Sequence, residues 1–164
     1  MVCAVIINAE NKRIKLCNEI IGLMHGYIQW NSYDTEAGGI ILGRENLGND
    51  NLIFEFITKP MKKDIRTKNR FLRKDSEHIE FYKQLYSKHN GVYAYYGEWH
   101  THPEDIPHYS IIDLTNWRKI SKEDPKEMQY HIIVGRKQLR IWEMRKKCFM
   151  PKLVCEVKWD EINI

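Results

Sequence analysis

Apolar and polar residues follow two different periods along the chain, and these periods predict its elements. The run VCAVIIN at residues 2–8 is rich in β-forming residues and predicts a strand. Residues 13–30 place apolar side chains from Ile14 to Ile28 at helical spacing, with Cys17 among them. We therefore expect a strand followed by an amphipathic helix in this part of the chain.

The next two apolar runs predict a hairpin. TEAGGIILGR at 35–44 and NLIFEFITK at 51–59 are joined by the turn-rich segment ENLGND. The basic stretch at 59–74 then predicts a loop, which ends in a short strand around KNRFLRKD.

Helical and strand patterns alternate through the rest of the chain. SEHIEFYKQLYSKHNG at 76–91 predicts a helix with Ser76 as its N-cap, and VYAYYGEWH at 92–100 predicts a strand. After a loop that contains two prolines, a further helix begins at Ser110, and three apolar segments predict three final strands. This order predicts one α/β domain over residues 1–164, in which helices sandwich a mixed sheet.

The charge of the chain is mildly basic. The formal net charge is +4, and residues 59–74 carry eight basic side chains against the single acid Asp64. Such a stretch is a solvated surface in most proteins, and the alternatives are a contact with an acidic partner or with nucleic acid. No RNA-recognition signature accompanies it, so nucleic acid is not an expected partner.

The cysteines and the N-terminal segment indicate the compartment. The four cysteines, at positions 3, 17, 148 and 155, form no CxxC pair, which argues against a zinc ribbon and a disulfide framework. We expect them to be reduced thiols in the core. The first residues meet charge too early for a signal peptide, and no run approaches the ~18 apolar residues of a membrane helix. The expected location is the cytoplasm, with no membrane partner.

Residues 98–113, EWHTHPEDIPHYSIID, raise the question of a metal site. His100 and His102 are two residues apart at the end of a predicted strand, so both imidazoles point to the same face. A catalytic zinc takes three protein ligands and keeps one position open. Asp113 lies in the first turn of the following helix, from which its carboxylate can turn back toward the strand. We therefore take Asp113 as the third ligand.

The same residues have other interpretations. Ser110 and Asp113 match a capping box, S/T-x-x-E, with aspartate in place of glutamate, and the histidine pair could be structural. Other HxH families fail on particular residues. A metallo-β-lactamase needs aspartate and histidine where Glu104 and Asp105 stand, an amidohydrolase barrel needs about 250 residues, and a zinc deaminase needs a later PCxxC.

The spacing H-x-H-P-x6-S-x2-D, from His100 to Asp113, resembles the JAMM motif of the JAB/MPN metalloproteases. That motif also has an upstream glutamate in a strand context, followed by small residues, which Glu36 and the segment AGGIILG match. The order of elements from about residue 2 to residue 145 is similar as well. The resemblance implies a single JAB/MPN-type domain with a mixed curved β-sheet sandwiched by helices.

Carried over to this sequence, the resemblance implies one catalytic Zn²⁺ ion held by His100, His102 and Asp113. Glu36 would be the general base and then the acid toward the leaving amine. Ser110 would donate a hydrogen bond to the oxyanion, with its capping role secondary.

Further residues lie near the motif in the sequence and are candidates for contacts with a substrate or for packing. Lys62 and Arg66 of the basic stretch are candidate substrate contacts beside a groove in which an extended tail adds as a strand. Glu104 and His108 can reach the metal region from the proline loop, but neither matches a ligand position of the family. Trp99 and Trp117 are expected to pack in the core, and the alternative is that they line the groove.

The resemblance also implies a substrate class. JAB/MPN enzymes cut amide or isopeptide bonds after the C-terminal tail of ubiquitin or a ubiquitin-like protein. GEWHTHPE-x-x-P and FLRKDSEH resemble the branch of integrative and conjugative elements and antiphage operons. Its CD-NTase-associated members release a nucleotidyltransferase from targets to which an E1/E2-like partner has joined it.

We therefore predict a bacterial deconjugating isopeptidase that binds its protein substrate by an extended C-terminal tail, with E1/E2-like and nucleotidyltransferase partners. One alternative is a JAB protease that trims a sulfur-carrier or other small protein. The other is a non-enzymatic MPN scaffold or a nucleic-acid-binding module.

Overall fold

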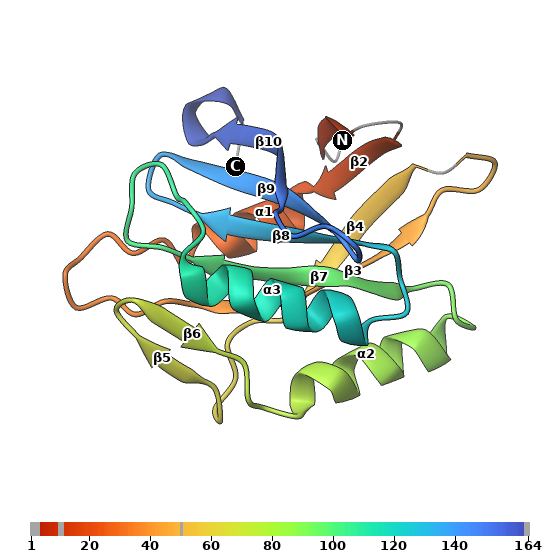
Figure 1. The fold of residues 1–164 in the computed structure, drawn as a ribbon, viewed down its shortest axis with the longest axis horizontal. Coiled ribbons are helices and arrows are strands. Elements are labelled where there is room, and N and C mark those ends of the chain that lie inside the picture. The colour runs from red at the N-terminus through yellow and green to blue at the C-terminus, as the bar shows by residue number, and fades with distance from the viewer. Residues whose placement is uncertain (1–3, 10–11, 50, 163–164) are drawn as a thin grey trace.

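A mixed sheet of eight strands forms the centre of the computed structural model, which describes residues 4–9, 12–49 and 51–162 (Figure 1). The strand order is β1-β2-β4-β3-β7-β8-β9-β10. β2 pairs with β4 and β7 with β8 in parallel, and all other neighbours in the sheet are antiparallel. The strands are β1 (Ala4–Ala9), β2 (Lys12–Cys17), β3 (Gly38–Glu45), β4 (Leu52–Ile57), β7 (Ala94–Thr101), β8 (Met128–Val134), β9 (Gln138–Arg145) and β10 (Lys152–Lys158).

Helices cover both faces of this sheet, which confirms the predicted fold class. α1 (Asn18–His25) lies on one face, and α2 (Glu77–Lys88) and α3 (Ile111–Glu123) lie on the other. A short 3-10 helix, η1 (Trp159–Glu161), follows β10. The predicted N-cap of α2 is only partly right, because Ser76 makes no side-chain cap bond. Among the described residues, no helix has the length and apolar content that a bilayer crossing requires.

The helix predicted over residues 13–30 is wrong in its first part, which forms β2 instead. Ile14 and Leu16 are fully buried in β2, whereas Arg13 and Lys15 between and before them are exposed. β2 pairs with β1 on one side and with β4 on the other, so long-range pairing outweighs the local helical spacing. The predicted first strand is confirmed where it is described, and residues 2–3 lie outside the described residues.

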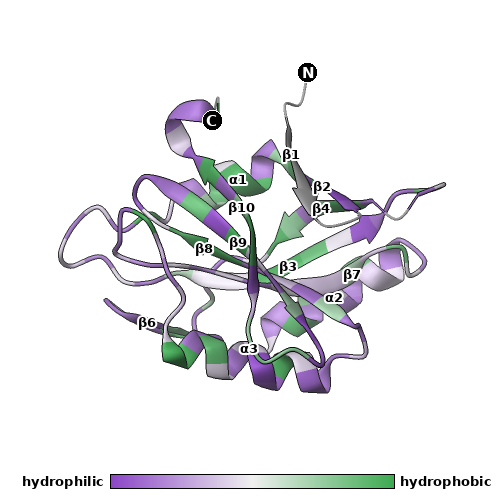
Figure 2. Cartoon of the chain, turned by 45° about the horizontal axis from the view of Figure 1, so that its top comes forward, coloured by the Kyte–Doolittle hydropathy of each residue, from purple (hydrophilic) through white to green (hydrophobic). Residues whose placement is uncertain are grey.

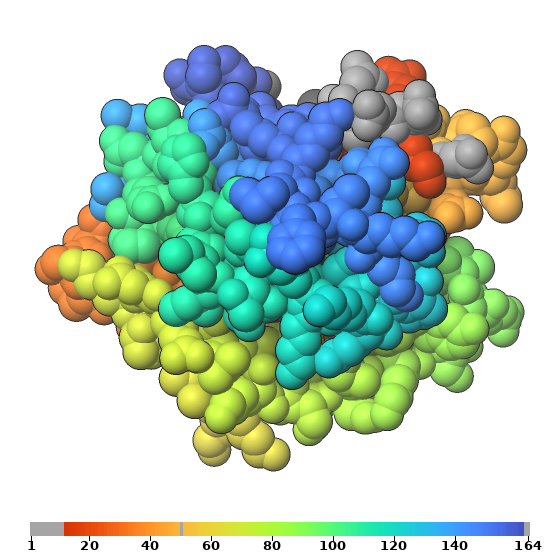
Figure 3. Space-filling view, in the orientation of Figure 1, coloured from red at the N-terminus to blue at the C-terminus, as the bar shows by residue number. Residues whose placement is uncertain are grey.

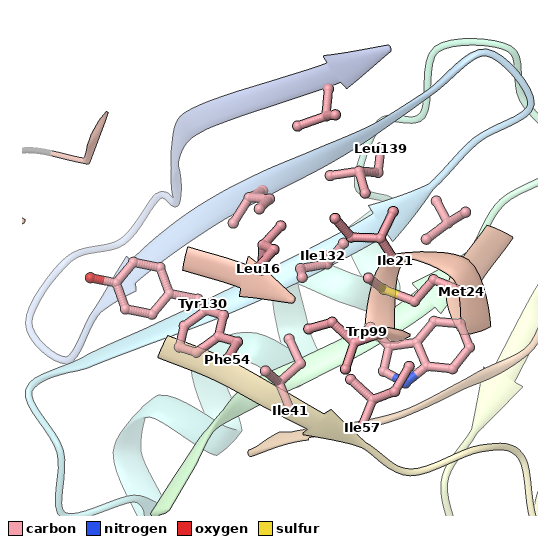
Figure 4. Close-up of a cluster of buried hydrophobic side chains, with 14 of the residues drawn as sticks. Leu16, Ile21, Met24, Ile41, Phe54, Ile57, Trp99, Tyr130, Ile132 and Leu139 are labelled. Carbon is pink, nitrogen blue, oxygen red and sulfur yellow. The ribbon is translucent and has the colours of Figure 1, made fainter. Parts of the chain in front are cut away.

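The larger core lies between α1 and the sheet (Figure 4). Ile21 and Met24 of α1 pack over a cluster to which most strands contribute, including Ile41, Trp99 and Ile132. β1 and β10 approach each other, so the sheet curves around this cluster. Trp99 is fully buried, as predicted.

A smaller apolar layer lies on the opposite face. α3 places Trp117, also buried as predicted, against three residues of β8 and β9: Ile133, Trp142 and Met144. α2 contacts β3 through Leu85, which packs with Ile40 and Leu42. The central strands are therefore apolar on both faces, and polar residues concentrate in the loops and on the outer sides of the helices (Figure 2).

The basic stretch forms a second small sheet, where a loop was predicted. β5 (Ile65–Thr67) and β6 (Arg70–Leu72) pair as an antiparallel hairpin. The predicted short strand corresponds to β6. β5 was missed because its three side chains are all exposed and carry no periodic signal.

A buried chain of polar groups anchors this hairpin. Thr58 Oγ1 accepts a hydrogen bond from the backbone N–H of Ile40 (2.9 Å) and lies 2.5 Å from His78 Nδ1. His78 Nε2 lies 2.8 Å from Asp64 Oδ2, and Asp64 Oδ1 accepts from the backbone N–H of Lys74. The chain therefore connects β3, the end of β4, the start of α2 and both ends of the hairpin segment.

Of the four cysteines, three lie in the described residues, and all three are free. Cys17 and Cys155 are partly buried, whereas Cys148 is exposed in the turn between β9 and β10. The prediction of core thiols is therefore wrong for Cys148. Cys3 lies outside the described residues.

Replacing Thr58 by valine should destabilise the protein by about 1–3 kcal/mol. The change keeps the shape of the side chain but leaves a buried N–H of Ile40 and one nitrogen of His78 without a partner. Urea unfolding measures the effect, and Thr67→Val on the exposed β5 is the matched control. Equal unfolding midpoints for the two variants would show that the polar chain does not stabilise the fold.

Candidate active site

The end of β7 directs His100 and His102 to the face of the sheet that α3 covers. In β7, Trp99 lies in the larger core on the other face, and His100 is paired in register with Ile133 of β8, a residue of the α3 layer. Thr101 fixes the backbone between the histidines, because its Oγ1 accepts from the N–H of Ala37 (2.9 Å). The strand thus presents two imidazoles on one face, as the sequence predicts.

The first turn of α3 brings Asp113 to these histidines. Asp113 Oδ1 is 3.2 Å from His100 Nε2, and Asp113 Oδ2 is 3.4 Å from His102 Nε2. The two histidine Nε2 atoms are 2.9 Å apart. Among the described residues, this is the group of three side chains whose ligand atoms are close enough to hold a metal ion together.

Ser110 and Asp113 also form a complete capping box. Ser110 Oγ accepts from the N–H of Asp113 (3.1 Å), and Asp113 Oδ2 accepts from the Ser110 N–H (2.6 Å). Ser110 Oγ further donates to Asp113 Oδ2 (2.7 Å). From the sequence, a helix cap and a metal ligand were alternative roles for Asp113. In the structure its carboxylate can serve both roles, because the hydrogen bonds of the capping box orient it toward the histidines.

Glu36 lies two residues before β3, and its backbone is tied to the β5–β6 hairpin. Its N–H donates to the carbonyl of Thr67 (2.8 Å), and its own carbonyl accepts from Arg66 Nε (2.7 Å). Glu36 is 4% exposed, with Oε1 3.9 Å from His102 Nε2. The structure therefore brings Glu36 into the same small site as the three candidate ligands.

The two buried carboxyl groups differ in their protonation behaviour because the histidines form hydrogen bonds with Asp113. Desolvation raises the pKa of Glu36 to about 8, and the neighbouring charge of Asp113 adds to the rise although His102 opposes it. Burial also acts to raise the pKa of Asp113, but hydrogen bonds from His100 and His102 hold that pKa well below its usual range. Glu36 can hold a proton near neutral pH, whereas Asp113 stays ionised as a ligand must.

Two glycines allow this close approach of β3, β7 and the hairpin. A Cβ on Gly38 would lie 2.5 Å from the Phe71 ring and from the Trp99 carbonyl oxygen. A Cβ on Gly39 would lie 2.1 Å from the carbonyl oxygen of Thr58. The small residues after Glu36 therefore have a packing reason.

We call His100, His102 and Asp113 the ligand group, and it lies in a cleft between β6 and α3. The cleft has a hollow on each side of this group, and both hollows are bordered by Phe71 of β6 and by Asp113. One hollow, of about 190 Å³, is lined by Glu36, His102 and Ser110 among others, and we call it the Glu36 hollow. The second, of about 210 Å³, runs past His100 between β6 and α3, and we call it the α3 hollow. In the space-filling view, the hairpin and α3 lie next to each other (Figure 3).

Arg66 and Lys62, the two candidate substrate contacts from the sequence, have different surroundings in the structure. Arg66 donates to the carbonyls of Glu36 and Thr35 (2.7 and 3.2 Å), so it holds the segment that contains Glu36. Lys62 is exposed in the turn before β5. A substrate contact by either residue stays a prediction.

The loop residues Glu104 and His108 do not join the ligand group. Glu104 Oε2 lies 3.6 Å from His102 Nδ1, the ring nitrogen that faces away from Asp113, and it accepts from the His108 N–H (2.8 Å). The His108 ring lies against Arg140. The contribution of Phe71 and its neighbours to the cleft was missed, because a three-residue strand gives no signal of what it packs against.

The sequence model of the prokaryotic homologs of the JAB domain matches residues 25–145. This match covers most of the chain, so the chain belongs to this family, and the resemblance drawn from the motif is confirmed.

Three curated relatives have the name CD-NTase/cGAS isopeptidase. The one from Escherichia coli is 33% identical over 138 residues, which cover 84% of this chain and 85% of the relative. The one from Pseudomonas aeruginosa is 34% identical over 116 residues (70% and 72%), and the one from Vibrio cholerae is 30% identical over 124 residues (76% and 77%). The solution structure of a protein from Desulfitobacterium hafniense has the same fold, with 16% identity, a TM-score of 0.55, and coverage of 88% of this chain and 90% of that one.

The raised pKa of Glu36 predicts a pH-dependent stability difference in metal-free protein. Folding raises this pKa from the usual ~4.3 to about 8, so the folded state binds more protons between these values. The contribution of Glu36 to stability is therefore full at low pH and is lost as pH rises toward about 8. The wild type should lose stability relative to Glu36→Gln between pH 5 and pH 9.

Urea unfolding in the presence of a chelator measures this difference. Glu45→Gln, at the exposed end of β3, is the matched control. If the stability of wild type and Glu36→Gln changed in parallel with pH, the raised pKa would be wrong.

Proposed function

We propose that this chain is a zinc-dependent isopeptidase that cuts after the C-terminal tail of a conjugated protein of the CD-NTase type. The observation that carries the proposal is the group of His100, His102 and Asp113 with Glu36 beside it, in a chain whose relatives are named isopeptidases. Membership of the JAB family agrees with the prediction of an enzyme that hydrolyses isopeptide bonds.

The three candidate ligands fit a zinc ion. Tetrahedral zinc with bonds of about 2.0–2.1 Å separates its donor atoms by roughly 3.3 Å. The two histidine Nε2 atoms are 2.9 Å apart, and they lie 3.2 Å from Asp113 Oδ1 and 3.4 Å from Asp113 Oδ2, respectively. Two imidazoles with one carboxylate are a common zinc donor set. When bound, zinc supplies an activated water and a Lewis acid for the scissile carbonyl.

Glu36 would move the proton. Its Oε1 lies on the His102 side of the ligand group, within the Glu36 hollow, where it can accept a proton from the attacking water. The same oxygen would then deliver that proton to the leaving nitrogen, which avoids the release of an unprotonated amine anion. A carboxyl group suits both transfers, because the group must accept and release a proton in each turnover.

Ser110 would donate a hydrogen bond to the carbonyl oxygen as negative charge develops there. Ser110 Oγ borders the Glu36 hollow and now donates to Asp113 Oδ2. A rotation about the Cβ–Oγ bond would redirect the hydroxyl proton while the backbone cap bond to Asp113 stays. Such a donor contributes about 2.7–4 kcal/mol in comparable sites.

The substrate tail would lie in an extended conformation between β6 and α3. β6 pairs with β5 along one edge, and its other edge borders the cleft. An extended peptide can add to such an edge through main-chain hydrogen bonds. In this proposal, Lys62 contacts the bound peptide, and Arg66 supports the hairpin beside it.

The names of the three relatives support a CD-NTase as the conjugated protein. We further propose that the enzyme acts in the cytoplasm and is encoded in an antiphage operon. An E1/E2-like partner from the same operon would make the conjugate that it cuts. A sulfur-carrier protein is the alternative substrate, and a neighbouring sulfur-carrier gene would favour it. A nucleic-acid module has less support, because Arg66 and Arg73 of the basic stretch are bonded within the protein.

Glu36→Gln should keep the fold and about one bound zinc but lower the kcat for cleavage by about 10²–10⁴-fold, because the proton acceptor is lost. The assay uses a fusion in which a reporter follows a CD-NTase tail, with zinc measured by mass spectrometry of metals. Asp113→Asn should lose most of the zinc as well as activity. Glu45→Gln is the control, and substantial turnover by Glu36→Gln would contradict the assigned role.

A further inference from the structure

Gln29 is a buried polar side chain to which the proposed mechanism gives no role. It lies in the loop of residues 26–37, which leads from α1 to β3 and contains Glu36, and it is 1% exposed. A buried amide group costs free energy unless its donors and its acceptor are paired. The partners of this amide therefore show which parts of the structure it holds together.

The amide group of Gln29 connects three segments that are distant in the sequence or separate in the fold. Its Nε2 donates to the carbonyl of Lys68 in the turn of the β5–β6 hairpin (2.8 Å) and to the carbonyl of Asp34 in the loop before Glu36 (3.2 Å). Its Oε1 accepts from Thr101 Oγ1 on β7 (3.1 Å). One side chain thus ties the hairpin turn and the loop to the strand that carries both histidines.

The chemistry of the partners requires an amide in this orientation. The carbonyl oxygens of Asp34 and Lys68 can only accept, so both need the NH₂ group. The Thr101 hydroxyl already accepts from the N–H of Ala37 (2.9 Å) and gives its own proton to Gln29 Oε1. A carboxylate at this position would face two carbonyl oxygens, and an apolar side chain would leave all three groups unpaired.

The three bonds meet at the two sides of the backbone around Glu36. On one side, the Glu36 N–H bonds to the hairpin, and on the other, the Ala37 carbonyl accepts from the Thr101 N–H (2.8 Å). Gln29 bonds to both sides, so it holds the hairpin against β7 with the Glu36 segment between them. This arrangement sets the separation of Glu36 Oε1 from His102 Nε2 (3.9 Å).

We propose that Gln29 is a positioning residue for Glu36, through which it affects proton transfer without touching a reacting atom. Gln29 lines neither hollow of the cleft. The inference rests on the proposed function. A proton acceptor must lie within hydrogen-bond reach of the water, and a displacement of about 1 Å can lower a rate about 10²-fold. Loss of the amide should lower kcat more than it raises KM, because the Thr58–His78–Asp64 chain still anchors the hairpin.

Gln29→Met tests the proposal, because methionine keeps the length of the side chain and removes all three hydrogen bonds. The matched control is Gln129→Met. Gln129 is also 1% exposed, but it lies on β8 and donates to the Ile120 carbonyl of α3 (3.4 Å). The substrate is a reporter fused to a CD-NTase tail, and kcat, KM and bound zinc are measured for each variant.

Gln29→Met should lower kcat at least tenfold, with KM within threefold of the wild type and about one bound zinc. Gln129→Met should keep kcat within twofold. The double variant of Gln29→Met with Glu36→Gln should have a kcat within twofold of Glu36→Gln alone, because Gln29 acts only through the Glu36 carboxyl group. A general loss of folding would instead lower kcat in both backgrounds.

Hydrogen exchange of the metal-free protein gives a measurement that does not depend on activity. Gln29→Met should speed the exchange of the Glu36 N–H and the Thr101 N–H at least fivefold, because both bond at the junction that the amide holds. The exchange of β8 and β9 should stay as in the wild type. Unchanged exchange at Glu36 and Thr101 would contradict the proposal.

Two variants of Thr101 carry the test if Gln29→Met does not fold. Thr101→Val keeps the shape of the side chain but removes the hydroxyl that joins Gln29 and Ala37 to β7, so kcat should fall at least tenfold. Thr101→Ser keeps the hydroxyl and should have a kcat within threefold of the wild type. Equal kcat values for the two variants would overturn the role of this junction.

The remaining outcomes separate this inference from the proposed function. If the wild type cut no tail, the proposed function and the role of Gln29 would both be wrong. If it cut the tail but Gln29→Met had the wild-type kcat, or lost a further tenfold in the Glu36→Gln background, the role of Gln29 alone would be wrong. Loss of zinc from Gln29→Met would make Gln29 a support of the ligand group and would also overturn the proposal.

Discussion

The pairing of β3 with β7 is the constraint on which the site depends. Gly38 is paired with His100, and beyond the ladder the Thr101 N–H donates to the carbonyl of Ala37 (2.8 Å). This register places Glu36 beside His102. A slip of one residue would turn both histidines into the core and Trp99 toward α3, because successive strand residues face opposite sides.

The pairing of β3 with β7 also requires glycines at the start of β3 and determines where the β5–β6 hairpin packs. Gly38 and Gly39 leave room for the Phe71 ring and for the carbonyl of Thr58, so β4 and β6 can approach β3 closely. The hairpin is held in turn by the buried Thr58–His78–Asp64 chain. Polar groups buried outside the candidate metal site therefore support the wall of the cleft, and their loss should disturb this wall as well as lower stability.

The site could be predicted from the sequence wherever short-range spacing decides geometry. His100 and His102 are related by the strand period, and Ser110 and Asp113 by the first turn of a helix, so local rules place each pair correctly. Glu36 was found only through the family resemblance, because a strand register far along the chain brings it to His102. β2 was mistaken for helix because its pairing with β4, a strand distant in the sequence, outweighs the local helical spacing. β5 was missed because its three exposed side chains carry no periodic signal.

The most direct test of the account is a comparison of tails on one reporter. The C-terminal tail of a CD-NTase from the same genome and the tail of ubiquitin are each fused to that reporter, and kcat/KM is measured with zinc-loaded protein. The account predicts that the CD-NTase tail is cut at least tenfold more efficiently, a difference of about 1.4 kcal/mol in transition-state stabilisation. Efficient cleavage of the ubiquitin fusion with indifference to the CD-NTase tail would contradict it.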